Sequence, residues 1–281
     1  MEPKGVIAFD IDGTLTHRLD WIDPKVVQRL EDLTRDNWRV ALLTGRIFSF
    51  AWNILQHLNF PYLLGVQNGA DILEMPSKKS LKRNYLSAQI IPQIEKAYLS
   101  QKEDFIIYAG IDKGDFCYYR KERYSEKMVQ YLKVLEKLGA APWQSSDFIF
   151  DDTYTFPLIK CFGEEKEMRT LYNILKHNPE IEVSMIRDPI DRALYLNLIT
   201  HPEASKGQAV HFLREYFQTP LVIAAGDDHN DLKMLQEADV GIAIETAPEE
   251  ILAYADVKAK PASELGIIDA IEEAIALASR T

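Results

Sequence analysis

The stretch Val6–Thr16, VIAFDIDGTLT, joins an apolar run to two carboxylates that stand only two positions apart. The four residues VIAF are typical of a strand buried on both faces, where ionised groups are costly. Asp10 and Asp12 follow this run, and the glycine and threonine after them indicate a turn of the chain. We therefore expect the two carboxylates to lie at the mouth of the core, where chemistry can take place.

The composition is that of a globular protein with an excess of acidic side chains. Of 281 residues, 47% are hydrophobic and 27% are charged, which excludes the disordered and fibrous classes. The 43 acidic residues outnumber the 32 basic ones, and the formal net charge of −11 argues against a nucleic-acid or anionic-membrane partner. A phosphorylated ligand would need a local cation or metal ion to overcome this negative field.

The cysteines and the apolar segments point to the cytoplasm. Cys117 and Cys161 are too few for a disulfide framework or a cysteine metal site. The first ten residues hold too short an apolar run for a secretory signal, and no window approaches the roughly 18 apolar residues of a membrane span. We therefore expect a cytoplasmic protein without a membrane partner.

Strands and helices alternate in both terminal parts of the chain. Apolar runs at 6–9, 39–43 and 221–225 predict strands, and amphipathic stretches at 24–37 and 207–217 predict helices. This alternation is typical of βαβ units with right-handed crossovers. The predicted fold class is α/β, with a Rossmann-like doubly wound parallel sheet as the core.

The middle of the chain has a different pattern. Aromatic-rich runs at 105–110 and 116–120 flank the turn signal IDKGD, which predicts a hairpin. This part also contains long amphipathic stretches, so a mixed α+β module is indicated. We predict a core of residues 1–71 and 200–281 that is interrupted by an inserted cap domain, residues 72–199.

Polar elements follow three of the predicted core strands. DIDGT follows VIAF, TGR follows VALL, and GDDHND follows VIAA, while a fourth element, SKG, opens a helix at Ser205. Ligands of an open parallel sheet bind beyond the carboxyl ends of its strands. We therefore expect all four elements to meet at one edge of the sheet.

These elements, DIDGT, LLTGR, SKG and GDDHND in that order, resemble the four motifs of the haloacid dehalogenase-like (HAD) phosphohydrolases. The long insertion after the turn QNGA is similar to the Cof-type branch, whose members carry a large α/β cap there. The resemblance implies a Mg²⁺-dependent phosphohydrolase. Its expected partners are small phosphorylated metabolites, sugar phosphates foremost, which it would cleave through an aspartyl-phosphate intermediate.

The resemblance also implies roles for the carboxylates. Asp10 would be the nucleophile, and Asp12 the general acid/base that protonates the leaving alkoxide and then deprotonates water. Mg²⁺ would be held by the Asp10 carboxylate, the Asp12 backbone carbonyl and Asp227, with Asp231 in the same metal site as a ligand or as a support. An acid at Asp12 favours phosphomonoester hydrolysis, because an alkoxide leaves poorly without a proton.

Other motif residues are expected to contact the phosphoryl group or the substrate. Thr44 would donate its hydroxyl to a phosphoryl oxygen, and the Lys206 ammonium would pair with that group and with Asp10. For Arg46 and Asn68, a solvated arginine and a turn asparagine are equally good interpretations. The expected substrate-binding residues are Gly13, Thr14, Gly45, Arg46, Asn68, Lys206 and Asn230.

Two polar features, a histidine and a basic run, receive a structural rather than a catalytic interpretation. His229 is interpreted as an exposed loop histidine, and the basic run KKSLKR at 78–83 as a solvated face.

Two alternative functions stay open. A phosphosugar mutase of the same fold would return the phosphoryl group to sugar instead of water. A non-catalytic regulatory or binding protein is the second alternative, although the complete set of motif residues argues against it. The oligomeric state is not predicted.

Overall fold

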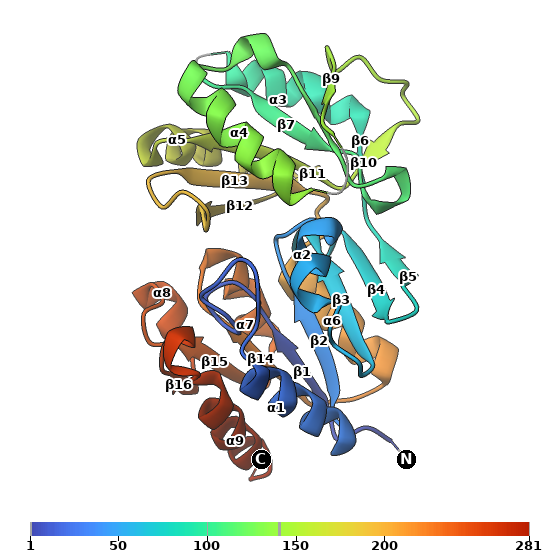
Figure 1. Ribbon diagram of the computed structural model, residues 1–281, viewed down its shortest axis with the longest axis vertical. Coiled ribbons are helices and arrows are strands. Elements are labelled where there is room, and N and C mark those ends of the chain that lie inside the picture. The colour runs from blue at the N-terminus through green and yellow to red at the C-terminus, as the bar shows by residue number, and fades with distance from the viewer. Residues whose placement is uncertain (1, 100, 140–141, 281) are drawn as a thin grey trace. The chain divides into compact units, whose positions relative to one another are not determined.

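The computed structural model describes residues 2–99, 101–139 and 142–280, and it contains two compact units. One comprises Met1–Thr44, Asn53–Arg83 and Ser205–Thr281, and the other Gly45–Trp52 and Asn84–Ala204. The blue and red ends of the chain therefore build the first unit, and the green and yellow middle builds most of the second (Figure 1).

The first unit is built on an eight-stranded sheet with the order β16-β15-β14-β1-β2-β3-β4-β5. Strand β1 (Val6–Phe9) lies at its centre, parallel to β14 (Val222–Gly226) on one side and to β2 (Arg39–Leu43) on the other. All four residues of β1 are buried, as the apolar run VIAF predicts. The remaining parallel strands are β3 (Tyr62–Val66), β15 (Val240–Ile244) and β16 (Val257–Ala259).

Helices cover both faces of this sheet, which confirms the predicted doubly wound α/β class (Figure 1). Helix α1 (Pro24–Arg35) begins after Asp23, whose carboxylate accepts a hydrogen bond from the Lys25 amide. On the opposite face, Leu213 and Met234 pack in one apolar cluster with β1 and β2. The other helices of the first unit are α6 (Lys206–Phe217), α7 (Leu232–Glu237), α8 (Glu249–Leu252) and α9 (Ile267–Ala278), whereas α2 (Phe48–Leu55) is divided between the two units. Within the described residues, none of the helices could span a membrane.

The first unit extends further along the chain than the sequence predicts. The predicted boundary lies between residues 71 and 72, but β4 (Asp71–Met75) pairs antiparallel with β3, and β5 (Lys79–Arg83) pairs with β4. The division therefore falls between residues 83 and 84. The basic run becomes the edge strand β5, where lysine side chains protect exposed backbone groups from pairing with another chain.

The second unit is an α+β module around a six-stranded sheet with the order β12-β13-β11-β7-β8-β9. The predicted hairpin is confirmed, because β7 (Phe105–Tyr108) pairs antiparallel with β8 (Cys117–Tyr119). Its core gathers Phe105, Phe156 and Leu171. The other elements are β6 (Leu86–Ser87), β9 (Gln144–Ser145), β10 (Thr155–Phe156), β11 (Leu158–Gly163), β12 (Glu182–Arg187), β13 (Tyr195–Thr200), α3 (Ile91–Tyr98), α4 (Glu126–Leu138) and α5 (Glu165–Leu175).

We expect the substitution Leu213→Ala to lower the free energy of unfolding by about 2–5 kcal/mol, because it leaves a cavity under α6. Urea unfolding followed by circular dichroism measures this change. Glu215→Ala, on the exposed face of the same helix, is the matched control and should change stability by less than about 0.5 kcal/mol. Equal losses in the two variants would contradict the assigned packing of α6.

Candidate active site

The register of the first sheet brings the predicted acidic elements together. Phe9 pairs with Ala225, and the Asp10 amide donates to the Ala225 carbonyl at 2.9 Å, so the loops after β1 and β14 begin side by side. Helix α6 starts at the same edge, where the Ser205 hydroxyl caps it by accepting a hydrogen bond from the Gln208 amide at 3.2 Å. The convergence expected from the sequence therefore occurs for three of the motifs.

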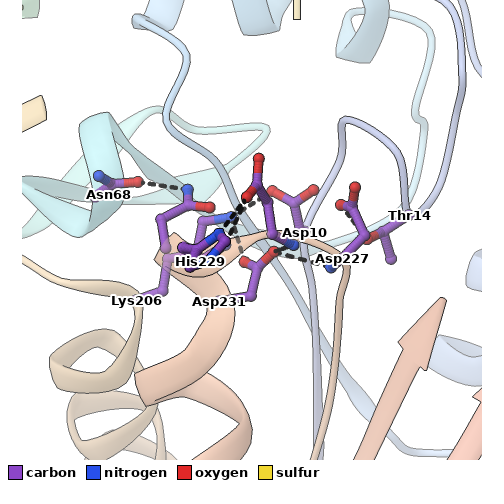
Figure 2. Close-up of polar contacts among 9 residues, drawn as sticks. Asp10, Thr14, Asn68, Lys206, Asp227, His229 and Asp231 are labelled. Atoms are coloured by element: carbon purple, nitrogen blue, oxygen red, sulfur yellow. Dashed lines mark hydrogen bonds and ion pairs between the residues drawn. The ribbon is translucent and has the colours of Figure 1, made fainter. Parts of the chain in front are cut away.

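Lys206 occupies the centre of this group. Its side chain is fully buried, and its ammonium forms ion pairs with the carboxylates of Asp10 and Asp231, the latter at 2.6 Å (Figure 2). Burial alone lowers the pKa of Lys206, but the two carboxylates outweigh it and raise the pKa above its ordinary value. Lys206 thus supplies the fixed positive charge that the acidic chain needs at an anion site.

Asp231 organises the loop that follows β14. Its Oδ1 accepts from Lys206, and its Oδ2 accepts from the backbone amides of Asp227 and Asp228 at 3.0 and 3.1 Å. Gly226 allows this close approach, because a Cβ there would collide with the Asp231 side chain. Since both carboxylate oxygens already have partners, Asp231 is better suited to support a metal site than to supply its ligand.

The carboxylates of Asp10 and Asp227 are crowded. Oxygen atoms from Asp10, Asp227 and Asp231 lie within 4.8 Å of one another. Burial, followed by the charges of Asp231 and Asp12, raises the pKa of Asp10 to about 7 against the opposing effect of Lys206. Burial and the neighbouring Asp10 and Asp231 raise the pKa of Asp227 well above its ordinary value. One ammonium does not balance these charges, and an all-oxygen donor set fits a hard divalent cation.

Gly13 and Thr14 hold Asp227 in place. The Thr14 hydroxyl donates to Asp227 Oδ1 at 3.1 Å and is buried (Figure 2). Gly13 has a φ of 90°, and a Cβ at this position would collide with the Asp227 carboxylate. The sequence predicts substrate contacts for both residues. Their contacts to a carboxylate more than two hundred positions away had no local signal in the sequence.

Asn68, Asn230 and Thr44 tie three loops together at the same edge. The Asn230 side-chain amide donates to Asn68 Oδ1 at 3.1 Å, and the Asn68 backbone amide donates to the Thr44 carbonyl at 2.9 Å. Asn68 has a φ of 59°, as expected for a turn asparagine. Its neighbour Gln67 is buried, and both polar atoms of its side chain lack partners within the described residues. The prediction omitted Gln67, although it stands in the same turn.

The last residues singled out from the sequence are Gly45, Arg46 and His229. Gly45 and Arg46 belong to the second unit, where the Arg46 guanidinium lies 4.0 Å from the centre of the Phe50 ring. Their expected contacts to substrate stay predictions. His229 is exposed and lies 3.0 Å from an Asp228 carboxylate oxygen, as a loop histidine would.

Residues 7–271 match the sequence model of the haloacid dehalogenase-like hydrolases. The chain belongs to this family. A relative from Haemophilus influenzae, provisionally named a phosphatase, is 36% identical over 277 residues, which cover 95% of this chain and 97% of the relative. The glucosyl-3-phosphoglycerate/mannosyl-3-phosphoglycerate phosphatase of Persephonella marina is 25% identical over 249 residues, which cover 85% and 84% of the two chains.

The fold of this HAD-like hydrolase also matches solved structures. The HAD subclass IIB sugar phosphatase BT4131 superposes with a TM-score of 0.74 at 21% identity, over 96% of this chain and 98% of the other. The expected family and enzyme class, a HAD-type phosphatase, are therefore confirmed.

The carboxylate cluster predicts a divalent-metal site that depends on Asp227. We expect saturable Mg²⁺ binding to the HAD-like hydrolase in calorimetry, and a rise in its melting temperature on Mg²⁺ addition. Asp227→Asn should weaken the binding by about tenfold or more, because it removes a charge from the cluster. Asp228→Asn, the adjacent acid outside the cluster, is the matched control, and an equal loss there would contradict the assignment.

Proposed function

We propose that this HAD-like hydrolase is a Mg²⁺-dependent phosphatase of small phosphorylated metabolites, with sugar phosphates as its main substrates and an aspartyl-phosphate on Asp10 as its intermediate. The observation that carries the proposal is the buried ion pair of Lys206 with Asp10 and Asp231, beside the Asp227 carboxylate. The names of the Persephonella marina relative and of BT4131 support the choice of sugar phosphates.

In the first step, a carboxylate oxygen of Asp10 attacks phosphorus, and the bond from phosphorus to the ester oxygen breaks. Asp12 gives its proton to the departing alkoxide, which would otherwise be a poor leaving group. The Lys206 ammonium and the Thr44 hydroxyl donate to phosphoryl oxygens. These contacts hold the phosphorus atom in line between the attacking Asp10 oxygen and the leaving ester oxygen. When bound by Asp10 and Asp227, Mg²⁺ supplies positive charge that offsets the phosphoryl oxygens.

In the second step, the Asp12 carboxylate takes a proton from water, and the water oxygen attacks phosphorus. The bond between phosphorus and Asp10 breaks, which returns Asp10 to its carboxylate form and releases inorganic phosphate. Lys206 then pairs again with Asp10. The proton balance closes within one turnover, because Asp12 regains the proton that it gave away.

The proposal includes a division of roles between the two units. The residues proposed for chemistry, Asp10, Asp12, Lys206 and Asp227, all belong to the first unit. We propose that the part of the second unit that is inserted after β5, Asn84–Ala204, determines which leaving group is accepted. A phosphate-release screen over sugar phosphates, nucleotides and phosphorylated glycerates, with parallel detection of sugar-phosphate isomers, tests the proposal. Isomer formation without phosphate release, or no turnover of any member with Mg²⁺, would refute it.

The substitution Asp10→Asn should abolish turnover, because the amide keeps the shape of the side chain but loses the attacking charge. We expect kcat to fall by about 10³-fold or more, with an unchanged circular dichroism spectrum. Asp20→Asn, an exposed acid in the loop after the same motif, is the control and should keep wild-type activity. Steady-state turnover by the Asp10 variant at a comparable rate would exclude Asp10 as nucleophile.

The substitution Asp12→Ala should affect substrates according to their leaving groups. For alkyl phosphates we expect a loss of about 10²–10⁴-fold in kcat/KM, because the departing alkoxide needs a proton. For p-nitrophenyl phosphate the loss in the same step should be clearly smaller, since nitrophenolate leaves without one. Comparison of kcat/KM for the two substrate classes measures this difference, and equal losses would contradict the acid role.

A further inference from the structure

A hollow of about 410 Å³ lies in the first unit at the opposite end of the sheet from the carboxylate cluster. It is lined by Arg39 and Tyr62, the first residues of β2 and β3, by Met75 at the end of β4, and by Phe217 at the end of α6. The proposed catalytic residues lie beyond the other ends of the parallel strands. The volume is within the range of small-molecule sites, about 300–1,000 Å³.

Two hydrogen-bond donors of the hollow's lining residues lack partners. The side-chain hydroxyl of Tyr62 and the Nε of Arg39 are buried without an acceptor among the described residues. Burial raises the pKa of Tyr62 above its ordinary value, so its hydroxyl stays a donor. Buried donors are nearly always paired in folded proteins, and both of these belong to residues that line the hollow.

Two side chains of opposite charge also line the hollow. Neither Arg39 nor Glu74 forms an ion pair in the part of the chain that the structure describes, and the Glu74 carboxylate accepts a hydrogen bond from the Ser77 hydroxyl at 3.4 Å. The registers of β2 with β3 and of β3 with β4 place Arg39, Leu63 and Glu74 on one face of the sheet. By contrast, Arg35 lines the same hollow but is already paired with Glu31 at 2.6 Å and Asp32 at 3.1 Å.

Aromatic side chains also contribute to the lining. Trp38 is buried, and the Arg39 guanidinium lies 5.7 Å from the centre of the Phe217 ring. A cation placed against an aromatic ring is held in position and keeps its other donors for a ligand. The hollow therefore combines the Arg39 guanidinium, the Glu74 carboxylate and apolar walls.

We propose that this hollow is a second binding site, for a small zwitterion of the class of α-amino acids with apolar side chains. The ligand carboxylate pairs with the Arg39 guanidinium, the ligand ammonium pairs with Glu74, and the apolar side chain packs on Trp38 and Phe217. A simple anion would meet repulsion from Glu74, and a simple cation would meet repulsion from Arg39.

Calorimetry on the full chain tests this site with L-phenylalanine, L-leucine and L-tryptophan as probes. We expect at least one of them to bind saturably at micromolar to millimolar concentration. Arg39→Gln and Glu74→Gln should each weaken that binding by about tenfold or more, because each leaves one ligand charge unpaired. Arg35→Gln is the matched control and should bind as the wild type does, and melting temperatures confirm that all variants fold.

Analogues lacking one charge decide the ligand class. 3-Phenylpropanoate lacks the ammonium and 2-phenylethylamine lacks the carboxylate, so both should bind about tenfold or more weakly than L-phenylalanine. The proposal is overturned if none of the three amino acids binds at millimolar concentration, or if both charge variants bind as the wild type does. Equal affinity for 3-phenylpropanoate and L-phenylalanine would also overturn it, since the site would then recognise an anion only.

Discussion

The buried ammonium of Lys206, held between the carboxylates of Asp10 and Asp231, is the interaction on which the site depends. Removing such ions from water costs several kcal/mol each, and their attraction offsets this only where the geometry is good and the remaining oxygens are bonded. The surrounding chain meets both conditions. Asp231 accepts three hydrogen bonds, two of them from backbone amides, so its position and that of the Asp227 loop are fixed together.

This charge arrangement explains the local sequence better than propensity does. Gly13 and Gly226 stand where a Cβ would collide with Asp227 or Asp231, so the two glycines let backbone and carboxylates approach closely. Thr14 is buried beside Asp227 and satisfies one of its oxygens. The central position of β1 is equally necessary, because only a strand flanked by β14 and β2 brings the loops after β1 and β14 to one edge.

The central strands of the first unit could be predicted from the sequence, because a short apolar run marks each of them. The apolar runs before Asp10, Thr44 and Asp227 became β1, β2 and β14, and the hairpin of β7 and β8 followed from aromatic runs around a turn. The predicted core segment ends at residue 71, whereas the first compact unit continues through β4 and β5; β5 is a polar, lysine-rich edge strand whose pattern resembles a loop. Helix α4 begins at Glu126, where Ser125 caps it by accepting from the Met128 amide.

Contacts between residues that are far apart in the chain could not be predicted from the sequence. The substrate contacts of Thr14 and Asn68 stay predictions, and the partners that the structure gives them, Asp227 and Asn230, are brought near only by the assembled sheet. For the same reason, the hollow at the amino ends of β2 and β3 could not be predicted from the sequence. Arg39, Tyr62 and Glu74 belong to three separate strands and follow no shared motif. Motifs report chemistry that is concentrated in short segments, and dispersed sites leave no such trace.

The two ends of the sheet are joined by β2, which begins at Arg39 and ends next to Thr44. Coupling between two sites requires an element with two arrangements that each ligand favours differently. After Arg39, β2 is buried and paired on both sides, to β1 and to β3, so it has little freedom to adopt a second arrangement. A ligand in the hollow would therefore stabilise the folded first unit by mass action, while leaving the geometry around Lys206 and Asp10 unchanged.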